Sequence, residues 1–168
     1  LLLVDRVVRI AVHPAVQGRG LGRMLLRELQ AQALQSGVDY LGASFGATAE
    51  LLGFWRQCSL LPVRVGLTRE ASSGEHSVMV MSPLSPEGKL LFAALQSRLA
   101  EQLPLLLGES LADVEATLVS MLFQLLPPAP LSLTPQDWRD VRSFGEALRG
   151  YEVCQPALWR LTGPYLSG

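Results

Sequence analysis

A glycine-rich segment, residues 17–22, constrains the fold of this chain more than any other stretch, because it joins two contrasting periodicities. Before it, residues 6–13 alternate with β-branched side chains on one face, which predicts a strand that Pro14 ends. After it, apolar residues recur at helical spacing until Ser36-Gly37, which predicts a helix. We therefore expect a strand, a tight turn and a helix in direct succession.

The first half of the chain continues this alternation of strands and helices. Residues 39–45 predict a second strand, and residues 48–58 a helix whose N-cap is Thr48. Two further strands, residues 60–67 and 77–81, flank a polar turn over residues 69–75. The order β-α-β-α-β-β predicts an α/β fold with a partly parallel sheet and crossover helices.

The second half shows no strand pattern. Proline and serine at residues 82–86 mark a shift in composition, so we expect one unit over residues 1–84 and an all-helical tail over residues 85–168. The expected helices span residues 86–103, 110–126 and 135–148, with a loose capping box at Ser110 and Asp113 and an N-cap at Thr134-Pro135.

Composition excludes several classes of protein. With 49% hydrophobic and 17% charged residues the chain has ample material for a core. A net charge of −1 argues against binding DNA or other nucleic acid by bulk charge. Cys58 and Cys154 have no metal-binding spacing, so we expect neither a metal site nor a disulfide, and a reducing cytoplasm fits.

No membrane segment is expected. The uncharged stretch over residues 116–136 is long enough to cross a bilayer, but it contains four prolines that would interrupt a helix. The apolar residues 1–4 are followed at once by charged ones and lack an initiating Met, so they do not form a leader peptide. Because they approach a predicted strand, we expect the chain to be a fragment of a longer protein.

The glycine-rich turn carries the most chemical content. A turn of this kind directs several backbone N–H groups outward at the positive end of a helix dipole, and such a nest binds a diphosphate. Glycine is needed because a side chain would block the close approach. A simple strand-to-helix turn is the alternative from spacing alone. A Walker loop and a dinucleotide fingerprint are excluded, since neither Gly-Lys-Ser/Thr nor a suitably placed acidic residue follows.

Several motifs of the sequence resemble those of a known enzyme family. The run Arg9-Ile10-Ala11-Val12-His13-Pro14, followed by Gln17-Gly18-Arg19-Gly20-Leu21-Gly22, resembles the acetyl-coenzyme A motif of GNAT N-acetyltransferases. Residues 39–46, 54–58 and 69–76 are similar to the tRNA(Met) cytidine acetyltransferase family, and general GNAT enzymes do not share these blocks. The match covers residues 6–84 and continues more weakly through the tail.

The resemblance implies both a fold and an activity. It implies the C-terminal portion of the GNAT fold, so that residues 1–84 form a partial acetyltransferase domain, and a tail that can bind tRNA. Such enzymes acetylate N4 of the wobble cytidine in elongator tRNA(Met) from acetyl-coenzyme A, and a separate module hydrolyses ATP. We expect this fragment alone to bind acetyl-coenzyme A weakly, if at all, and not to turn over.

The resemblance also implies a set of coenzyme contacts. The backbone of Ile10, Ala11 and Val12 would pair with the pantetheine arm, and Glu50 would contact the coenzyme from the following helix. Gln57 occupies a position where the family has an arginine, which puts that contact in doubt. The residues expected around the diphosphate are Gln17, Gly18, Arg19, Gly20, Leu21, Gly22 and Arg23.

A second departure from the family lies just after the helix over residues 48–58. Ser59-Leu60 stands where the family has Gly-Phe. If φ is positive at Ser59, the missing glycine costs about 1 kcal/mol.

The catalytic residues are less defined. An exocyclic cytosine amine is a poor nucleophile, so an enzyme must orient it, accept its proton and stabilise an oxyanion. His13 is the candidate for proton relay, although a cap at the strand end before Pro14 is the simpler interpretation. Direct transfer needs no covalent cysteine, and Cys58 fits a buried helix residue. For His76, a solvated hairpin is a simpler interpretation than an RNA contact.

Three hypotheses follow from these residues. The first is tRNA cytidine acetylation, and the second is a GNAT enzyme that acts on a protein or a small amine. The third is a non-catalytic RNA-binding module, which the absence of a triphosphate loop favours. Arginines and aromatic residues alternate in the tail, which suits RNA, but acidic residues among them cancel much of the charge.

Overall fold

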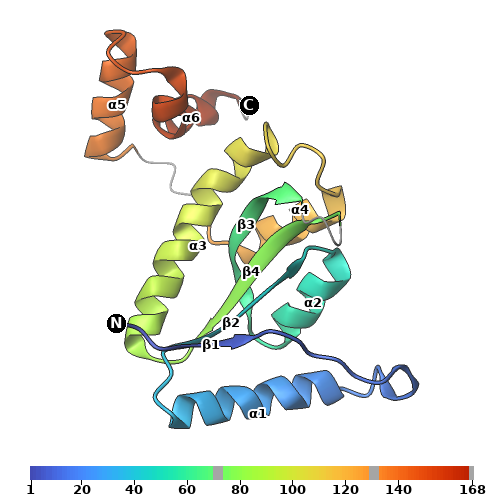
Figure 1. Cartoon of the computed structure of the whole chain (residues 1–168). Helices are drawn as coiled ribbons and strands as arrows, with labels where there is room; N and C mark the ends of the chain where they lie inside the picture. The colour runs from blue at the N-terminus through green and yellow to red at the C-terminus, as the bar shows by residue number, and fades with distance from the viewer. Residues whose placement is uncertain (70–73, 129–132, 167–168) are drawn as a thin grey trace.

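Four strands form one mixed sheet in the order β1-β2-β4-β3 (Figure 1). This computed structural model describes residues 1–69, 74–128 and 133–166. The strands are β1 (Val4–Val7), β2 (Tyr40–Gly46), β3 (Leu61–Arg69) and β4 (His76–Pro83). β1 pairs with β2 in parallel, whereas β4 runs antiparallel to both β2 and β3. The sheet is therefore parallel only where a helical crossover joins β1 to β2.

The helices fall into a group beside the sheet and a pair beyond it. A short 3-10 turn, η1 (Pro14–Val16), precedes the crossover helix α1. In Figure 1, α3 runs alongside the sheet, and α5 and α6 lie beyond the far end of α3. The α-helices are α1 (Leu21–Gln35), α2 (Ala49–Gln57), α3 (Pro86–Leu107), α4 (Ala116–Leu125), α5 (Pro135–Gly145) and α6 (Tyr151–Leu166).

One hydrophobic core joins the sheet to α2, α3 and α4. Leu41, Val78 and Val80 on the sheet are fully buried, and Leu103 of α3 and Leu122 of α4 belong to the same cluster. The core therefore crosses the expected boundary at residue 84, and the first two tail helices help to support the sheet. Division of the chain at that residue stays a prediction.

Asp39 ties three segments together at one end of the sheet. Its carboxylate accepts hydrogen bonds from the Leu3 amide at 2.7 Å and from the Ser85 hydroxyl at 2.5 Å. Its carbonyl accepts from the amides of Leu84 and Ser85. The Ser85 hydroxyl bond, followed by that from Leu3, holds the pKa of Asp39 below its usual value. The start of β1, the start of β2 and the N-cap of α3 are thus fixed by one residue.

The predicted order β-α-β-α-β-β is confirmed, with its predicted cap at Thr48 and helix end at Ser36-Gly37. The first strand is shorter than predicted, since it covers Val4–Val7 and residues 8–13 leave the sheet. Residues 70–73 of the predicted turn lie outside the described residues.

The predicted helix boundaries in the tail needed correction. The capping box at Ser110 and Asp113 is wrong, because α4 begins after Glu115, and Asp113 instead bonds Arg69 and His76. α3 continues through Pro104, a residue that normally interrupts a helix, because buried leucines on both sides pack against the core.

The sequence suggested that His76 lies in a solvated hairpin, but its side chain is buried. Its side chain is only 6% exposed, and its Nδ1 lies 2.9 Å from the Gly66 carbonyl oxygen. Its Nε2 lies 3.3 Å from Asp113, which also accepts two hydrogen bonds from Arg69. These bonds, with that from Arg69 the largest cause, lower the pKa of Asp113. The hairpin is therefore fastened to the segment before α4.

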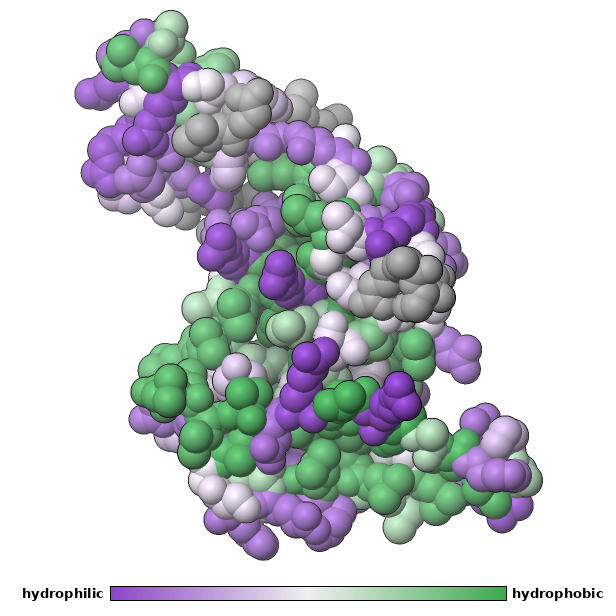
Figure 2. Space-filling view, viewed as in Figure 1, coloured by the Kyte–Doolittle hydropathy of each residue, from purple (hydrophilic) through white to green (hydrophobic). Residues whose placement is uncertain are grey.

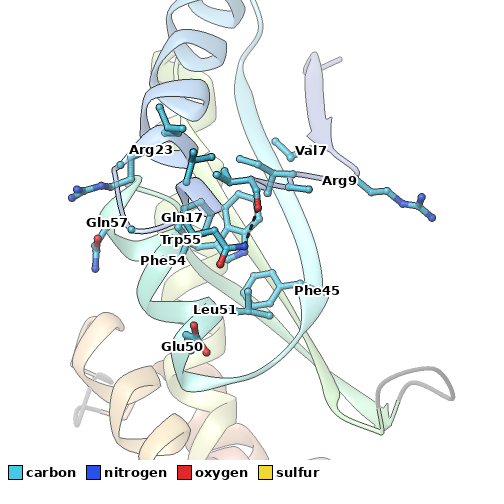
Figure 3. A pocket seen from close by; sticks show the side chains of 18 of the residues that line it. Val7, Arg9, Gln17, Arg23, Phe45, Glu50, Leu51, Phe54, Trp55 and Gln57 are labelled. Carbon is cyan, nitrogen blue, oxygen red and sulfur yellow. Dashed lines mark hydrogen bonds between the residues drawn. The ribbon is translucent and has the colours of Figure 1, made fainter. Parts of the chain in front are cut away.

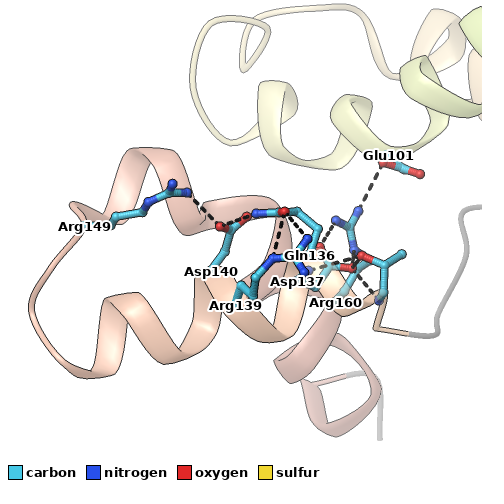
Figure 4. A network of polar contacts seen from close by, with 8 residues as sticks. Glu101, Gln136, Asp137, Arg139, Asp140, Arg149 and Arg160 are labelled. Carbon is cyan, nitrogen blue, oxygen red and sulfur yellow. Dashed lines mark hydrogen bonds and ion pairs between the residues drawn. The ribbon is translucent and has the colours of Figure 1, made fainter.

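A polar network holds the α5–α6 pair to α3 (Figure 4). The predicted N-cap at Thr134 is confirmed as a full capping box with Asp137. Arg160 of α6 donates to Asp137, with Nε at 3.1 Å from Oδ2, and reaches Glu101 of α3 at 3.1 Å. Burial raises the pKa of Asp137, but bonds from Arg160 and Thr134 outweigh it and the net change is downward. Arg160 thus links three helices through one side chain.

The network predicts a pH-dependent anchor for the tail. The pKa of Asp137 is lower in the folded state than in the unfolded chain. The stability that the Asp137 carboxylate contributes is therefore complete when the pH is above the ordinary Asp pKa, near 3.9. It is lost as the pH falls through the lower pKa of the folded state. At pH 7, Asp137→Asn should reduce the opening free energy of α5 and α6 by about 2 kcal/mol. Hydrogen exchange of the backbone amides in each helix measures this opening free energy.

The matched control is Asp140→Asn. Asp140 pairs with Arg149, whose side chain is 49% exposed, so its loss should cost less than about 1 kcal/mol. Equal effects of the two substitutions at pH 7 would contradict this account of the anchor.

Ser59 is strained, as the departure from Gly-Phe predicted. Its φ is 61°, and its amide and that of Leu60 donate to the carbonyls of Arg56 and Trp55. This is the bonding of a Schellman motif, whose left-handed position favours glycine. Ser59→Gly should therefore raise the free energy of unfolding by about 1 kcal/mol. In contrast, Ser36→Gly should give no gain in denaturant unfolding, because Ser36 has a φ of −83°.

Candidate functional site

A cavity opens where the chain after β1 separates from β2. The parallel pairing ends at Val7 and Ala43, whereas β2 continues to Gly46 in its bonding with β4. Residues 8–12 therefore leave the sheet while β2 goes on, and a cavity of about 680 Å³ lies between the two segments (Figure 3). This volume falls within the range of small-molecule sites.

The glycine-rich loop forms one wall of this cavity. Gly18 and Gly20 have φ values of 75° and 80°, which residues with a Cβ rarely adopt. Gly20 is the N-cap of α1 and offers no side-chain bond, so the first amides of the helix stay uncapped. Across the described part of the chain, the amides of residues 18–23 have no hydrogen-bond acceptor. An anion at this wall would meet unpaired N–H groups and the positive end of the helix dipole.

Gln17 fixes the loop to the segment that leaves the sheet. Its side-chain Nε2 donates to the Val12 carbonyl at 2.9 Å, as Figure 3 shows. Gln17 occupies one lone pair of the Val12 carbonyl oxygen. A ligand that bonds to the Val12 backbone must therefore use the second lone pair of this oxygen or the Val12 N–H group. The two walls of the cavity are therefore held in a defined relation by a side chain rather than by sheet pairing.

Aromatic rings form the apolar wall opposite the loop. Phe45 stacks on Trp55 with centroids 5.7 Å apart, and Phe54 meets Trp55 edge-on at 5.4 Å. Trp55 is buried, whereas the other two rings are partly exposed to the cavity. Such a wall suits an apolar or amphipathic chain and excludes water from it. Only the fold reveals that Phe54 and Trp55 line this wall.

The structure gathers almost all of the predicted coenzyme residues at this cavity. Every residue in that predicted set lines it except Arg19. Glu50 lines it from the first turn of α2, and Gln57 from the last. The coenzyme roles of these residues stay predictions, but residues 10–12, 17, 18, 20–23, 50 and 57 do share one site, as the resemblance implied.

His13 and Cys58 lie away from the cavity. His13 does not line it, and its Nδ1 accepts a hydrogen bond from the Ala15 amide at 3.2 Å. This bond makes His13 the N-cap of η1, whereas the predicted alternative was a cap at a strand end, and β1 ends earlier, at Val7. Cys58 is buried, and burial raises the pKa of its thiol although Arg23 acts in the opposite direction. A thiol of this kind is a poor nucleophile.

The chain is similar in sequence to known acetyltransferases. The family model "GNAT acetyltransferase 2" matches residues 24–85. A tRNA(Met) cytidine acetyltransferase TmcA of Nitrosococcus halophilus is 46% identical over 94% of this chain. The TmcA of Yersinia pestis is 38% identical over 95%, and that of Methanopyrus kandleri 32% identical over 95%. The chain belongs to the tRNA(Met) cytidine acetyltransferase family.

The chain matches only a part of these family members. It spans 21% of the Nitrosococcus protein, 22% of the Yersinia protein and 19% of the Methanopyrus protein. A solved putative GNAT acetyltransferase from Desulfovibrio desulfuricans is 22% identical, with a TM-score of 0.45 over 49% of this chain and 53% of that one. The family assignment thus rests on sequence, and it agrees with the α/β class of the fold.

The residues that the structure describes contain neither a cluster of metal-binding side chains nor a membrane-spanning helix. Among them, no group of three or more His, Cys, Asp or Glu side chains is arranged to hold a metal ion. Nor is any described helix both long enough and apolar enough to cross a membrane.

The close approach of α1 to α2 at the cavity is testable. A Cβ on Gly22 would lie 3.1 Å from the Phe54 ring, so Gly22→Ala forces that ring to move. We expect Gly22→Ala to cost about 1–2 kcal/mol with Phe54 present, and to be neutral or stabilising in the Phe54→Leu background. Denaturant unfolding of the four proteins gives the coupling. An equal effect of Gly22→Ala in both backgrounds would contradict this packing.

Proposed function

We propose that this chain provides the acetyl-coenzyme A site of a tRNA(Met) cytidine acetyltransferase. The observation that carries the proposal is the cavity between residues 8–12 and β2, with unpaired loop amides at one wall and aromatic rings at another. GNAT acetyltransferases use acetyl-coenzyme A as donor, and the relatives that match this chain are named for acetylation of cytidine in tRNA(Met).

The residues present fit this coenzyme. Its diphosphate would lie at the amides of residues 18–23, where Arg23 also lines the cavity and supplies a positive charge. Its pantetheine arm is extended and carries amides, which suits the backbone of residues 10–12, where no strand pairs and only the Val12 carbonyl accepts a side-chain bond, and the apolar wall of Phe45 and Trp55. A Cβ at Gly18 or Gly20 would force the backbone out of its left-handed conformation and disturb the nest.

Positioning is the contribution that we assign to this chain in the reaction. When bound, the coenzyme supplies an activated acetyl thioester. The loop amides fix its diphosphate, residues 10–12 orient its arm, and the aromatic wall keeps water from the thioester. Glu50 is the one carboxylate in the described lining, and we assign it to the coenzyme. We assign removal of the N4 proton of cytidine to groups outside this cavity, with His13 retained as a prediction.

The remaining parts of the proposal concern the whole protein. We propose that the acceptor is the wobble cytidine of elongator tRNA(Met), that the tail over residues 85–168 contributes to tRNA binding, and that ATP is hydrolysed by a module outside these residues. A cytoplasmic location fits this role and the two cysteines, both of which are free and buried.

Nucleoside mass spectrometry of cellular tRNA tests the proposal. Deletion of the gene should abolish N4-acetylcytidine in elongator tRNA(Met), and the unmodified gene should restore it. Complementation with Gly20→Ala should restore less than about a tenth, because loss of the nest removes several kcal/mol of positioning. An unchanged acetylcytidine level after deletion would overturn the tRNA assignment and leave a GNAT enzyme that acts on a protein or small amine.

The matched control is Gly37→Ala. Gly37 has a φ of 73°, close to that of Gly20, and a Cβ there would meet nothing within 4 Å. Both substitutions therefore carry a similar backbone penalty of about 1 kcal/mol, but only Gly20 lines the cavity. Equal losses of acetylcytidine would assign the effect to stability and contradict the role of the nest.

A further inference from the structure

A chain of hollows leads away from the coenzyme cavity, and neighbouring hollows share lining residues. Ser44 lines both the cavity and a hollow of about 380 Å³ on the sheet. Arg64 lines that hollow and a groove of about 600 Å³ between β3 and α3. Glu109 and Gln155 line the groove and a hollow of about 500 Å³ beside α6. We call this series of neighbouring hollows, from the cavity to the helical tail, the track.

The first part of the track is one row of side chains across three strands. Ser44 of β2 pairs with Met79 of β4, and Arg64 of β3 pairs with the same Met79. These side chains lie on the face of the sheet opposite the buried Val78 and Val80, and Met79 is 43% exposed. The row joins the mouth of the cavity to the outer strand without crossing the core.

The middle part of the track carries positive charge that is not neutralised within the described chain. Arg64 and Arg98 are exposed, and within the described residues neither guanidinium has a hydrogen-bond or ion-pair partner. Glu109, an acidic side chain in the groove, accepts a hydrogen bond from Gln155 at 3.2 Å. The charged residues of the groove are therefore Arg64, Arg98 and Glu109, and most of its other lining residues are apolar.

The far part of the track is aromatic. Phe144, Tyr151 and Trp159 line the hollow beside α6, and each is between 39% and 52% exposed. Phe144 and Tyr151 meet edge-on at 6.4 Å, which orders the two rings without covering their faces. Exposed rings beside a groove that carries arginines are the combination on which single-stranded nucleic acid stacks and tracks.

The surface outside the track has a different character. In Figure 2, apolar side chains gather over β1 and along one side of α1, whereas hydrophilic and apolar side chains are mixed where β3 and α3 meet.

From these observations we propose that the track binds single-stranded RNA. Its phosphates would pair with Arg64 and Arg98, its bases would stack on Tyr151 and Trp159, and one end would reach the cavity at Ser44. The proposal rests on the proposed function, which requires a cytidine to approach the acetyl donor, and it names the route by which the acceptor strand does so.

Fluorescence anisotropy of a labelled single-stranded RNA of about 12 nucleotides with the purified chain tests the track. The double variant Arg64→Gln/Arg98→Gln should lower the slope of log Kd against log salt by about 1.4, since each lost contact removes about 0.7. Trp159→Leu should weaken binding about fivefold or more without changing the slope. Thermal unfolding verifies that all variants fold.

The matched control is Arg142→Gln, which removes an exposed arginine of α5 that does not line the track. It should leave both affinity and slope unchanged. A lack of RNA binding by the unmodified chain, or equal effects of Arg142→Gln and the double variant, would overturn the proposal.

Coenzyme affinity, measured on the same proteins, separates this proposal from the proposed function. The arginine and tryptophan variants should retain the coenzyme affinity of the unmodified chain. If the unmodified chain does not bind the coenzyme, the coenzyme site is rejected and the track is not. If the double variant shows the same slope of log Kd against log salt as the unmodified chain, the track is rejected and the coenzyme site is not.

Discussion

The structure depends on the separation of two parallel strands. After Val7 the chain leaves β2, and residues 8–12 give up the inter-strand hydrogen bonds that a longer parallel pair would make. Residues 8–12 are exposed or half-buried, so solvent can satisfy their backbone groups, and the two walls are held by contacts other than sheet pairing. Gln17 holds one wall through the Val12 carbonyl, and the stack of Phe45 on Trp55 forms the other. The cavity, the loop and the orientation of α1 all follow from this separation.

The rest of the fold keeps the separation open by fixing the ends of the elements around it. Asp39 joins the start of β1, the start of β2 and the cap of α3, so the strands are aligned before they diverge. α3 and α4 complete the core beneath the sheet, which places part of the helical tail within the support of the site. The outer pair α5 and α6 is attached mainly by polar contacts through Arg160, and it carries the exposed aromatic rings.

Local patterns predicted the elements well where local physics decides them. Thr48 and Thr134 were recognised as caps from residue type and position, and Ser59 as a strained residue from a missing glycine. The end of β1 was not predictable, because residues 8–13 retain the alternation of a strand although no neighbour pairs with them. Asp113 looked like a capping residue. Its bonds to Arg69 and His76 were not predictable, because they join segments that are distant in sequence. The site residues came from a motif, whereas the aromatic wall required the fold.

The most direct test of the account is a nuclear magnetic resonance titration of the ¹⁵N-labelled chain with acetyl-coenzyme A, which detects even weak binding. If the loop amides bind the diphosphate, the largest shift changes will fall on the backbone N–H groups of residues 18–23, with smaller ones on residues 10–12. Removal of the diphosphate, by use of pantetheine alone, should abolish the first set and retain the second. Shift changes confined to other residues, or none at millimolar coenzyme, would contradict the account.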